Sequence, residues 1–287
     1  MYRTRRFRVL GYHFAFQSND EGLARYLDEM FDACLTPTGP TAWYSILPGH
    51  ESKHTHLIYH DGRLVMSAGS AGFVPKFLTW DVNRRAIRAT QATHVTLHAG
   101  VVARQGEALL LPADMEAGKT TLVAGLLKLG FEYLSDEAAP IDPSTYHVQP
   151  FPKPLSLDKG SWHLFPECKP LLPGTTDDYA SDQWQVGPRA FGATAAPHGL
   201  PVRLVVFPRY VAGAATELRP IRPVEALIRL LKQTFGLRDQ LERNLDTLGS
   251  LAERTQQFEL TMGALDSACD LVEDVVGLTS RLAGSER

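Results

Sequence analysis

The sequence lacks several features that define large classes of proteins. It has three cysteines in 287 residues, Cys34, Cys168 and Cys269, and no CxxC pair, which argues against a disulfide framework or a cysteine-based zinc site. No apolar run reaches the roughly 18 residues of a membrane span. The N-terminal arginines have no apolar segment behind them, unlike a secretory signal peptide. These absences predict a protein of the reducing cytoplasm.

An excess of charge of one sign is also missing. The formal net charge is −3, so there is no broad basic field to attract nucleic acid or a membrane surface. A hydrophobic content of 44% and a charged content of 21% are those of an ordinary globular protein. The length allows one large domain or two small ones.

The most informative segment is Leu109–Leu122, LLLPADMEAGKTTL. An apolar run ends at Pro112, a short loop follows, and the sequence GKTT opens a segment with helical spacing. This layout is typical of a phosphate-binding P-loop. The N–H groups and the dipole of a helix N-terminus both favour an anion there. The sequence therefore predicts a phosphate site formed by Ala113, Asp114, Met115, Glu116, Ala117, Gly118, Lys119, Thr120 and Thr121.

The P-loop is a variant. Ala113 stands where the consensus has its first glycine, and Glu116 places an acid inside the loop. We expect Lys119 to reach the β- and γ-phosphates and Thr120 to bind Mg²⁺. The alternative is a buried strand joined to an amphipathic helix by a turn, with Lys119 in solvent.

An acidic pair, Asp136-Glu137, follows the predicted strand 131–134. Phosphoryl transfer needs a group that accepts the proton of the attacking hydroxyl and acids that hold the metal. In a parallel α/β sheet the strand ends meet at one edge, which would bring both acids to the phosphates. The alternative is that they are simple turn residues.

Two domains are predicted along the chain. Residues 1–90 have the pattern of a small α+β domain, including a hairpin around Asp61-Gly62. Residues 91–287 are expected to form an α/β P-loop catalytic domain with C-terminal helices. Within the second domain, residues 140–201 are rich in proline and polar residues and are expected to form loops.

Four segments, in order, carry a family resemblance: His98–Val102, Leu109–Pro112, Gly118–Thr120 and Leu134–Glu137. Together they resemble the catalytic domain of HPr kinase/phosphorylase. They resemble more closely the HPr-kinase-related proteins of uncharacterised or peptide-tailoring gene clusters. Pro150–Leu157 and Val206–Tyr210 are also similar to those kinases, and the resemblance covers roughly residues 91–220.

The resemblance implies a role for individual residues. Asp136, His98 and Lys119 would be catalytic, with Asp136 as the general base. Thr120 and Glu137 would hold the metal. A histidine beside Asp136 could orient its carboxylate, although a structural hydrogen bond in the core is the alternative.

Other expected features of that family are weaker or missing. Arg209 could bind the nucleotide and stabilise charge on the transferring phosphoryl group. The family's second signature segment and its HPr-binding helices are not recognisable, so neither HPr as the substrate nor the phosphorylase reaction has support.

The sequence thus predicts an ATP- and Mg²⁺-dependent kinase with an HPr-kinase-like fold. Its acceptor would be a hydroxyl of a peptide, a protein or a small molecule, and it could form a homo-oligomer. The alternative is a non-catalytic nucleotide-binding partner protein, which Glu116 motivates because an anion in the loop should weaken phosphate binding. A third hypothesis is a small-molecule carboxykinase with a similar P-loop architecture, although no carboxylate-binding arginine cluster supports it.

Overall fold

The computed structural model describes residues 1–49, 55–170 and 183–284 of this α/β protein. By their internal contacts the residues form two compact units, 1–89 with 152–191 and 90–151 with 192–287. The second segment of the first unit, 152–191, was expected within the P-loop domain. It contacts the first segment directly, because the Tyr26 hydroxyl donates to the Gln185 carbonyl at 3.3 Å and Arg189 lies 2.8 Å from Asp32.

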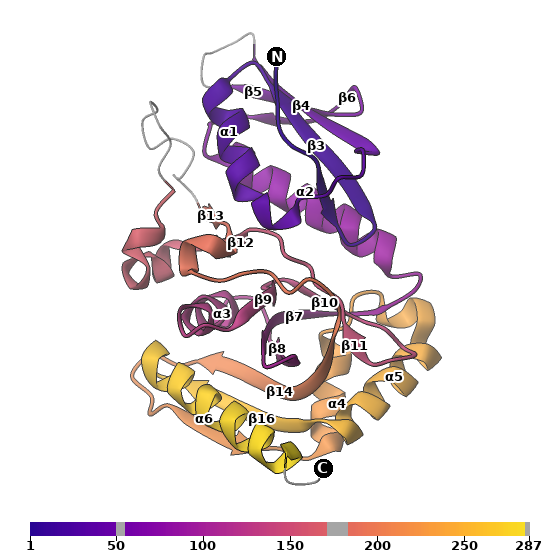
Figure 1. Ribbon diagram of the computed structural model, residues 1–287, viewed down its shortest axis with the longest axis vertical. Coiled ribbons are helices and arrows are strands. Elements are labelled where there is room, and N and C mark those ends of the chain that lie inside the picture. Colours follow the sequence, from indigo (N-terminus) through magenta and orange to yellow (C-terminus); the bar gives the residue numbers. More distant parts are fainter. Residues whose placement is uncertain (50–54, 171–182, 285–287) are drawn as a thin grey trace. The chain divides into compact units, whose positions relative to one another are not determined.

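The first unit contains a six-stranded sheet with the order β1-β3-β4-β5-β6, in which β2 pairs with β3 (Figure 1). Its strands are β1 (Tyr2–Arg3), β2 (Phe7–Val9), β3 (Tyr12–Ser18), β4 (Ala42–Pro48), β5 (His56–His60) and β6 (Arg63–Ala68). Its helices are α1 (Glu21–Met30), the 3₁₀ helix Asp32–Cys34 and α2 (Phe73–Thr90). The predicted hairpin is confirmed, since Asp61 and Gly62 connect β5 and β6 with φ angles of 48° and 77°.

Residues 152–191 were expected to be loops, and the part that the structure describes contains short elements instead. They are β12 (Leu155–Leu157), β13 (Trp184–Val186) and the 3₁₀ helices Lys159–Leu164, Pro166–Cys168 and Pro188–Phe191. The strands β12 and β13 pair with each other. The indole rings of Trp162 and Trp184 stack at 4.7 Å, which shows that local aromatic packing orders a segment that its proline content marks as irregular.

The second unit is built on an eight-stranded mixed sheet with the order β11-β10-β7-β8-β14-β16-β15, in which β9 also pairs with β7. The strands are β7 (Val95–Arg104), β8 (Glu107–Pro112), β9 (Glu132–Ser135), β10 (Ala138–Ile141), β11 (His147–Val148), β14 (Leu200–Tyr210), β15 (Glu217–Pro220) and β16 (Gln256–Met262). The helices are α3 (Lys119–Lys128), α4 (Pro223–Lys232), the 3₁₀ helix Leu237–Gln240, α5 (Leu241–Arg254) and α6 (Leu265–Gly284). No described helix is both long and apolar enough to cross a membrane.

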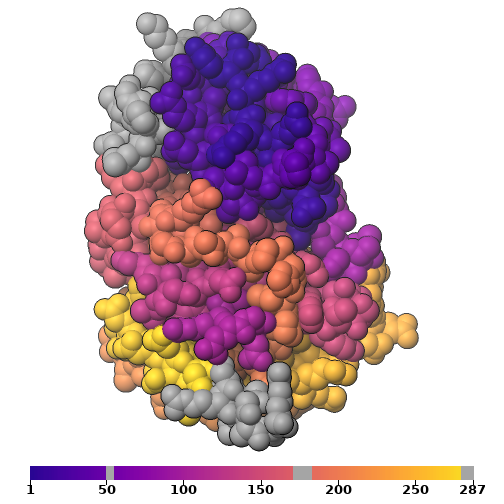
Figure 2. All heavy atoms as spheres, in the orientation of Figure 1, coloured from indigo at the N-terminus to yellow at the C-terminus, as the bar shows by residue number. Residues whose placement is uncertain are grey.

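Helices cover both faces of this sheet. Alternate residues of β7, such as Leu97 and Val101, share one apolar cluster with Ala226 of α4 and Leu251 of α5. The intervening residues of β7 therefore face α3. The helices α3 and α6 pack together on that second face, and their atoms are neighbours in the space-filling view (Figures 1 and 2).

The sheet differs from the parallel sheet that the sequence suggested. The strand β7 lies between β8 and β9 and is antiparallel to both. Because both flanking strands oppose β7, they run in the same direction, and their carboxyl ends reach the same edge. The acidic pair thus lies beside the predicted P-loop, but the two strands are separated by a third one.

Candidate functional site

The loop of residues 113–118 connects the end of β8 to the start of α3. Gly118 is the N-cap of α3 and has a φ of 83°, a conformation that favours glycine. A Cβ atom at Gly118 would lie 2.9 Å from Met262 Cε and 3.3 Å from Tyr210 Cβ. Close packing against the ends of β14 and β16 is therefore a second reason for glycine at this position.

Lys119, the first residue of α3, lies against β7. Its side chain is buried, and its Nζ atom lies 2.6 Å from His98 Nε2. The alternative expected from the sequence, a lysine in solvent, does not occur. Gly100 permits this approach of the helix to the strand, because a Cβ there would lie 2.7 Å from Val123 Cγ2 and 3.2 Å from Lys119 Cγ.

The surroundings of His98 favour its neutral form. Burial lowers the pKa of His98 below its ordinary value, and the positive charge of Lys119 lowers the pKa further. The Lys119 ammonium can then donate to the free electron pair of His98 Nε2. The His98 backbone N–H donates to the Gln233 carbonyl at 2.7 Å, so the turn after α4 fixes the position of this histidine.

Asp136 is buried, and hydroxyl groups contact both of its carboxylate oxygens. The Thr120 hydroxyl donates to Oδ2 at 3.3 Å, and the Tyr133 hydroxyl donates to Oδ1 at 2.9 Å. Tyr133 is itself fully buried on β9. The carboxylate of Asp136 is therefore held in a defined orientation beside the first turn of α3.

Glu137 has a different environment from Asp136. Its side chain is 36% exposed, and Oε1 lies 3.9 Å from His98 Nε2. The two acids interrupt an otherwise continuous strand, because the Ser135 hydroxyl accepts hydrogen bonds from the N–H groups of both Glu137 and Ala138 at 3.0 Å. This local turn separates the acids, one toward the interior and the other toward solvent.

The middle of the loop is exposed and anchored at its two sides. Asp114, Met115 and Glu116 are exposed, and Glu116 has a φ of 63°. On one side, Gln233 Nε2 donates to Asp114 Oδ1 at 2.7 Å. On the other, the Tyr210 N–H donates to the Ala117 carbonyl at 3.1 Å.

Arg209 is not among the residues that the site brings together. It is exposed at the end of β14, two positions after Phe207, which belongs to the core beneath α4 and α5. Strand alternation places Arg209 on that same face, and Tyr210 on the face that carries Lys119. No ion pair between Arg209 and an acid occurs among the described residues.

Three residues of the site were not identified from the sequence, namely Tyr133, Tyr210 and Gln233. Tyr133 reads as a buried strand residue, and Gln233 lies more than 100 positions from the loop, so neither carries a local signal. Tyr210 belongs to a segment that the sequence marks as family-like, which was the available indication.

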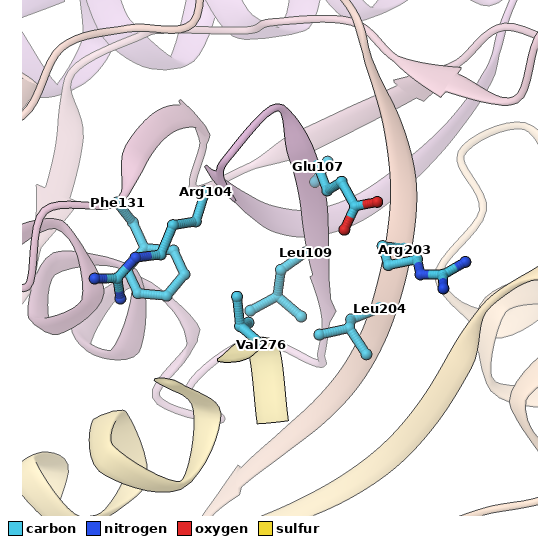
Figure 3. A pocket seen from close by; sticks show the side chains of 8 residues that line it. Arg104, Glu107, Leu109, Phe131, Arg203, Leu204 and Val276 are labelled. Atoms are coloured by element: carbon cyan, nitrogen blue, oxygen red, sulfur yellow. The ribbon is translucent and has the colours of Figure 1, made fainter. Parts of the chain in front are cut away.

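The described residues contain no group of three or more histidine, cysteine, aspartate or glutamate side chains placed to hold a metal ion. Two hollows of the second unit also lie away from the loop. A hollow of about 130 Å³ is lined by residues that include His94, Asp239 and Arg243. The other, of about 10 Å³, lies between Arg104, Phe131 and Val276 (Figure 3).

Comparisons with known proteins add a fold likeness only. No protein family model matches the sequence, and no curated protein matches it. Among solved structures, the HPr(Ser) kinase/phosphatase from Coxiella burnetii is similar at 13% sequence identity and a TM-score of 0.32. The match covers 66% of this chain and 98% of that one. A likeness this distant assigns no activity, so the function must be inferred from the side chains.

Proposed function

We propose that this protein is an ATP- and Mg²⁺-dependent kinase that phosphorylates a hydroxyl group. The observation that carries the proposal is the cluster at the first turn of α3. Lys119 lies there beside His98, and Thr120 contacts the buried carboxylate of Asp136. A cation, a hydroxyl and a carboxylate at the end of a strand–loop–helix unit are the groups that phosphoryl transfer requires.

The chemistry of the loop fits a polyphosphate. Gly118 provides no side chain to cap α3, so the first turn of the helix is not capped from that position. The N–H groups and the dipole of such a turn attract anionic oxygens. The exposed position of Glu116 is compatible with the expectation that its carboxylate points away from the phosphates.

The oxygen donors nearby fit Mg²⁺, a cation that prefers hydroxyl, carboxylate and water ligands. Thr120 would bind it directly, and Glu137, which is partly exposed, would support it. Bound ATP would supply the phosphoryl group. The oxygen of the acceptor hydroxyl would bond to the γ-phosphorus as the bond to the ADP oxygen breaks, and Asp136 would take the hydroxyl proton.

The acceptor is proposed only as a class, a serine or threonine of a peptide or protein, or an alcohol of a small molecule. We retain Arg209 as a nucleotide contact only in this proposal, since the sequence suggested it and its side chain starts on the other sheet face. The alternative of a non-catalytic nucleotide-binding protein makes a distinct experimental prediction, which is binding without turnover.

The test is transfer of label from [γ-³²P]ATP with Mg²⁺ to a peptide library, to small-molecule alcohols and to cell extract. Wild-type protein should label an acceptor, and the variants Lys119→Met and Asp136→Asn should not. Saturable ATP binding with no labelled acceptor and no ADP formed would favour the non-catalytic alternative. Absence of ATP binding would contradict both.

A further inference from the structure

We infer that Tyr210 is the platform on which the nucleotide base stacks, and that ATP lies across the loop with its base on the β14 side. The inference rests on the proposed function and deepens it. It assigns a binding role to a residue outside the P-loop and gives the bound nucleotide a direction.

The direction follows from the strand order. The strand β8, which leads into the loop, has β7 on one side and β14 on the other. The groups suited to the reacting phosphate gather on the β7 side, where His98, Lys119 and Asp136 lie. If the γ-phosphate lies there, the rest of an extended nucleotide must lead away from β7, and β14 is the strand that it reaches.

Tyr210 is joined to the loop on that second side. Its backbone N–H donates to the Ala117 carbonyl at 3.1 Å, and its Cβ lies 3.3 Å from the position that a Gly118 Cβ would occupy. The ring is therefore attached next to the last loop residue before α3. Because alternation along β14 places Tyr210 on the α3 face, the ring starts on the same side of the sheet as Lys119.

The chemistry of the position is that of a stacking surface. The Tyr210 side chain is 56% exposed, although a ring of this size is usually more buried. Met115 of the loop, 84% exposed, is a second large apolar side chain at the same loop. An exposed aromatic ring beside a phosphate cradle offers a flat π-face to any base, which gives affinity with little discrimination between adenine and guanine.

The test compares ATP with inorganic tripolyphosphate, which has the phosphates but no base. Both are titrated by calorimetry, with Mg²⁺, into wild-type protein and into Tyr210→Ala, Tyr210→Phe and the control Tyr2→Ala. Tyr2 is also exposed, at 48%, but belongs to the other unit. Tyr210→Ala should weaken ATP binding at least about fivefold, the factor equivalent to about 1 kcal/mol of stacking. It should leave tripolyphosphate binding within about twofold, and Tyr210→Phe and Tyr2→Ala should resemble wild type.

Each other outcome overturns the inference in a recognisable way. Unchanged ATP affinity in a folded Tyr210→Ala variant would remove the platform and leave the proposed function intact. An equal loss for ATP and tripolyphosphate would mean that Tyr210 only supports the loop. If wild-type protein bound neither ligand, the proposed function would fail together with the inference.

A photolabelling experiment covers the case in which Tyr210→Ala does not fold. Wild-type protein is irradiated with 8-azido-ATP and digested with trypsin, which cleaves after Arg209. Label should appear on the peptide that begins at Tyr210, and an excess of ATP should suppress it. Label confined to peptides from other strands would place the base elsewhere and overturn the inference.

Discussion

The side chains of Lys119 and His98 form a close pair, with Nζ 2.6 Å from Nε2. The two residues come from different elements, the first turn of α3 and the middle of β7. The contact holds the lysine against the sheet, where a neutral histidine accepts its hydrogen bond. Any phosphate that binds Lys119 must therefore compete with His98.

We expect the variant Lys119→Met to raise the pKa of His98. Burial remains in the variant, but the positive neighbour that also lowers the pKa is gone. The pKa is measured from the His98 Cε1–H resonance by NMR. His94→Gln is the matched control for assigning the signal, because the pKa of His94 is also lowered by burial.

The same shift predicts how stability depends on pH. Because the folded pKa of His98 lies below its ordinary value of about 6.5, the unfolded state binds more protons in that window. The contribution to stability is fully present above the ordinary value and is lost as the pH falls through the folded pKa. Lys119→Met should show a smaller loss of stability on acidification. An unchanged His98 pKa in this variant would show that the contact does not exist in solution.

The variant Asp136→Asn should bind ATP almost as wild type does but turn over roughly 10²–10⁴-fold more slowly, the usual contribution of a positioned general base. Its amide keeps one oxygen as an acceptor for the hydroxyls of Thr120 and Tyr133, so the fold should persist. The rate is measured as ADP formation with an acceptor present. Glu132→Gln on the same strand is the control, and a parental rate in Asp136→Asn would make another group the base.

The variant Glu116→Gly should change ATP affinity by less than about tenfold, or 1.4 kcal/mol. Glu116 is exposed, so little repulsion of phosphate is removed. The variant should also be at least as stable as wild type by thermal unfolding, because a φ of 63° costs a non-glycine residue on the order of 1 kcal/mol. A gain in ATP affinity of several orders of magnitude would instead indicate a degenerate binding protein.

Local patterns predicted much of the fold. Apolar spacing and turn residues located α2, the β5–β6 hairpin and the β8–α3 unit, because each depends on residues close together in the chain. The sequence also suggested the grouping of His98, Lys119 and Asp136, which belong to consecutive elements. Short strands such as β15 have no strong pattern and were missed.

Features that depend on distant residues could not be predicted. The antiparallel β7 between β8 and β9 is a matter of strand order, which periodicity does not encode. The contact of Gln233 with Asp114 joins the end of α4 to the loop. The opposite faces of Arg209 and Tyr210 depend on the register of β14, and a one-residue slip would exchange them.

Binding of ATP with Mg²⁺ to wild-type protein and to Lys119→Met, measured by calorimetry, tests the central claim most directly. Lys128→Met, at the exposed end of the same helix, serves as the control. We predict saturable binding to wild type and to the control, and a loss of about 1–3 kcal/mol in Lys119→Met, the size of a hydrogen bond from a charged group. Equal affinity in Lys119→Met and wild type, or no binding to either, would contradict a phosphate site at this loop.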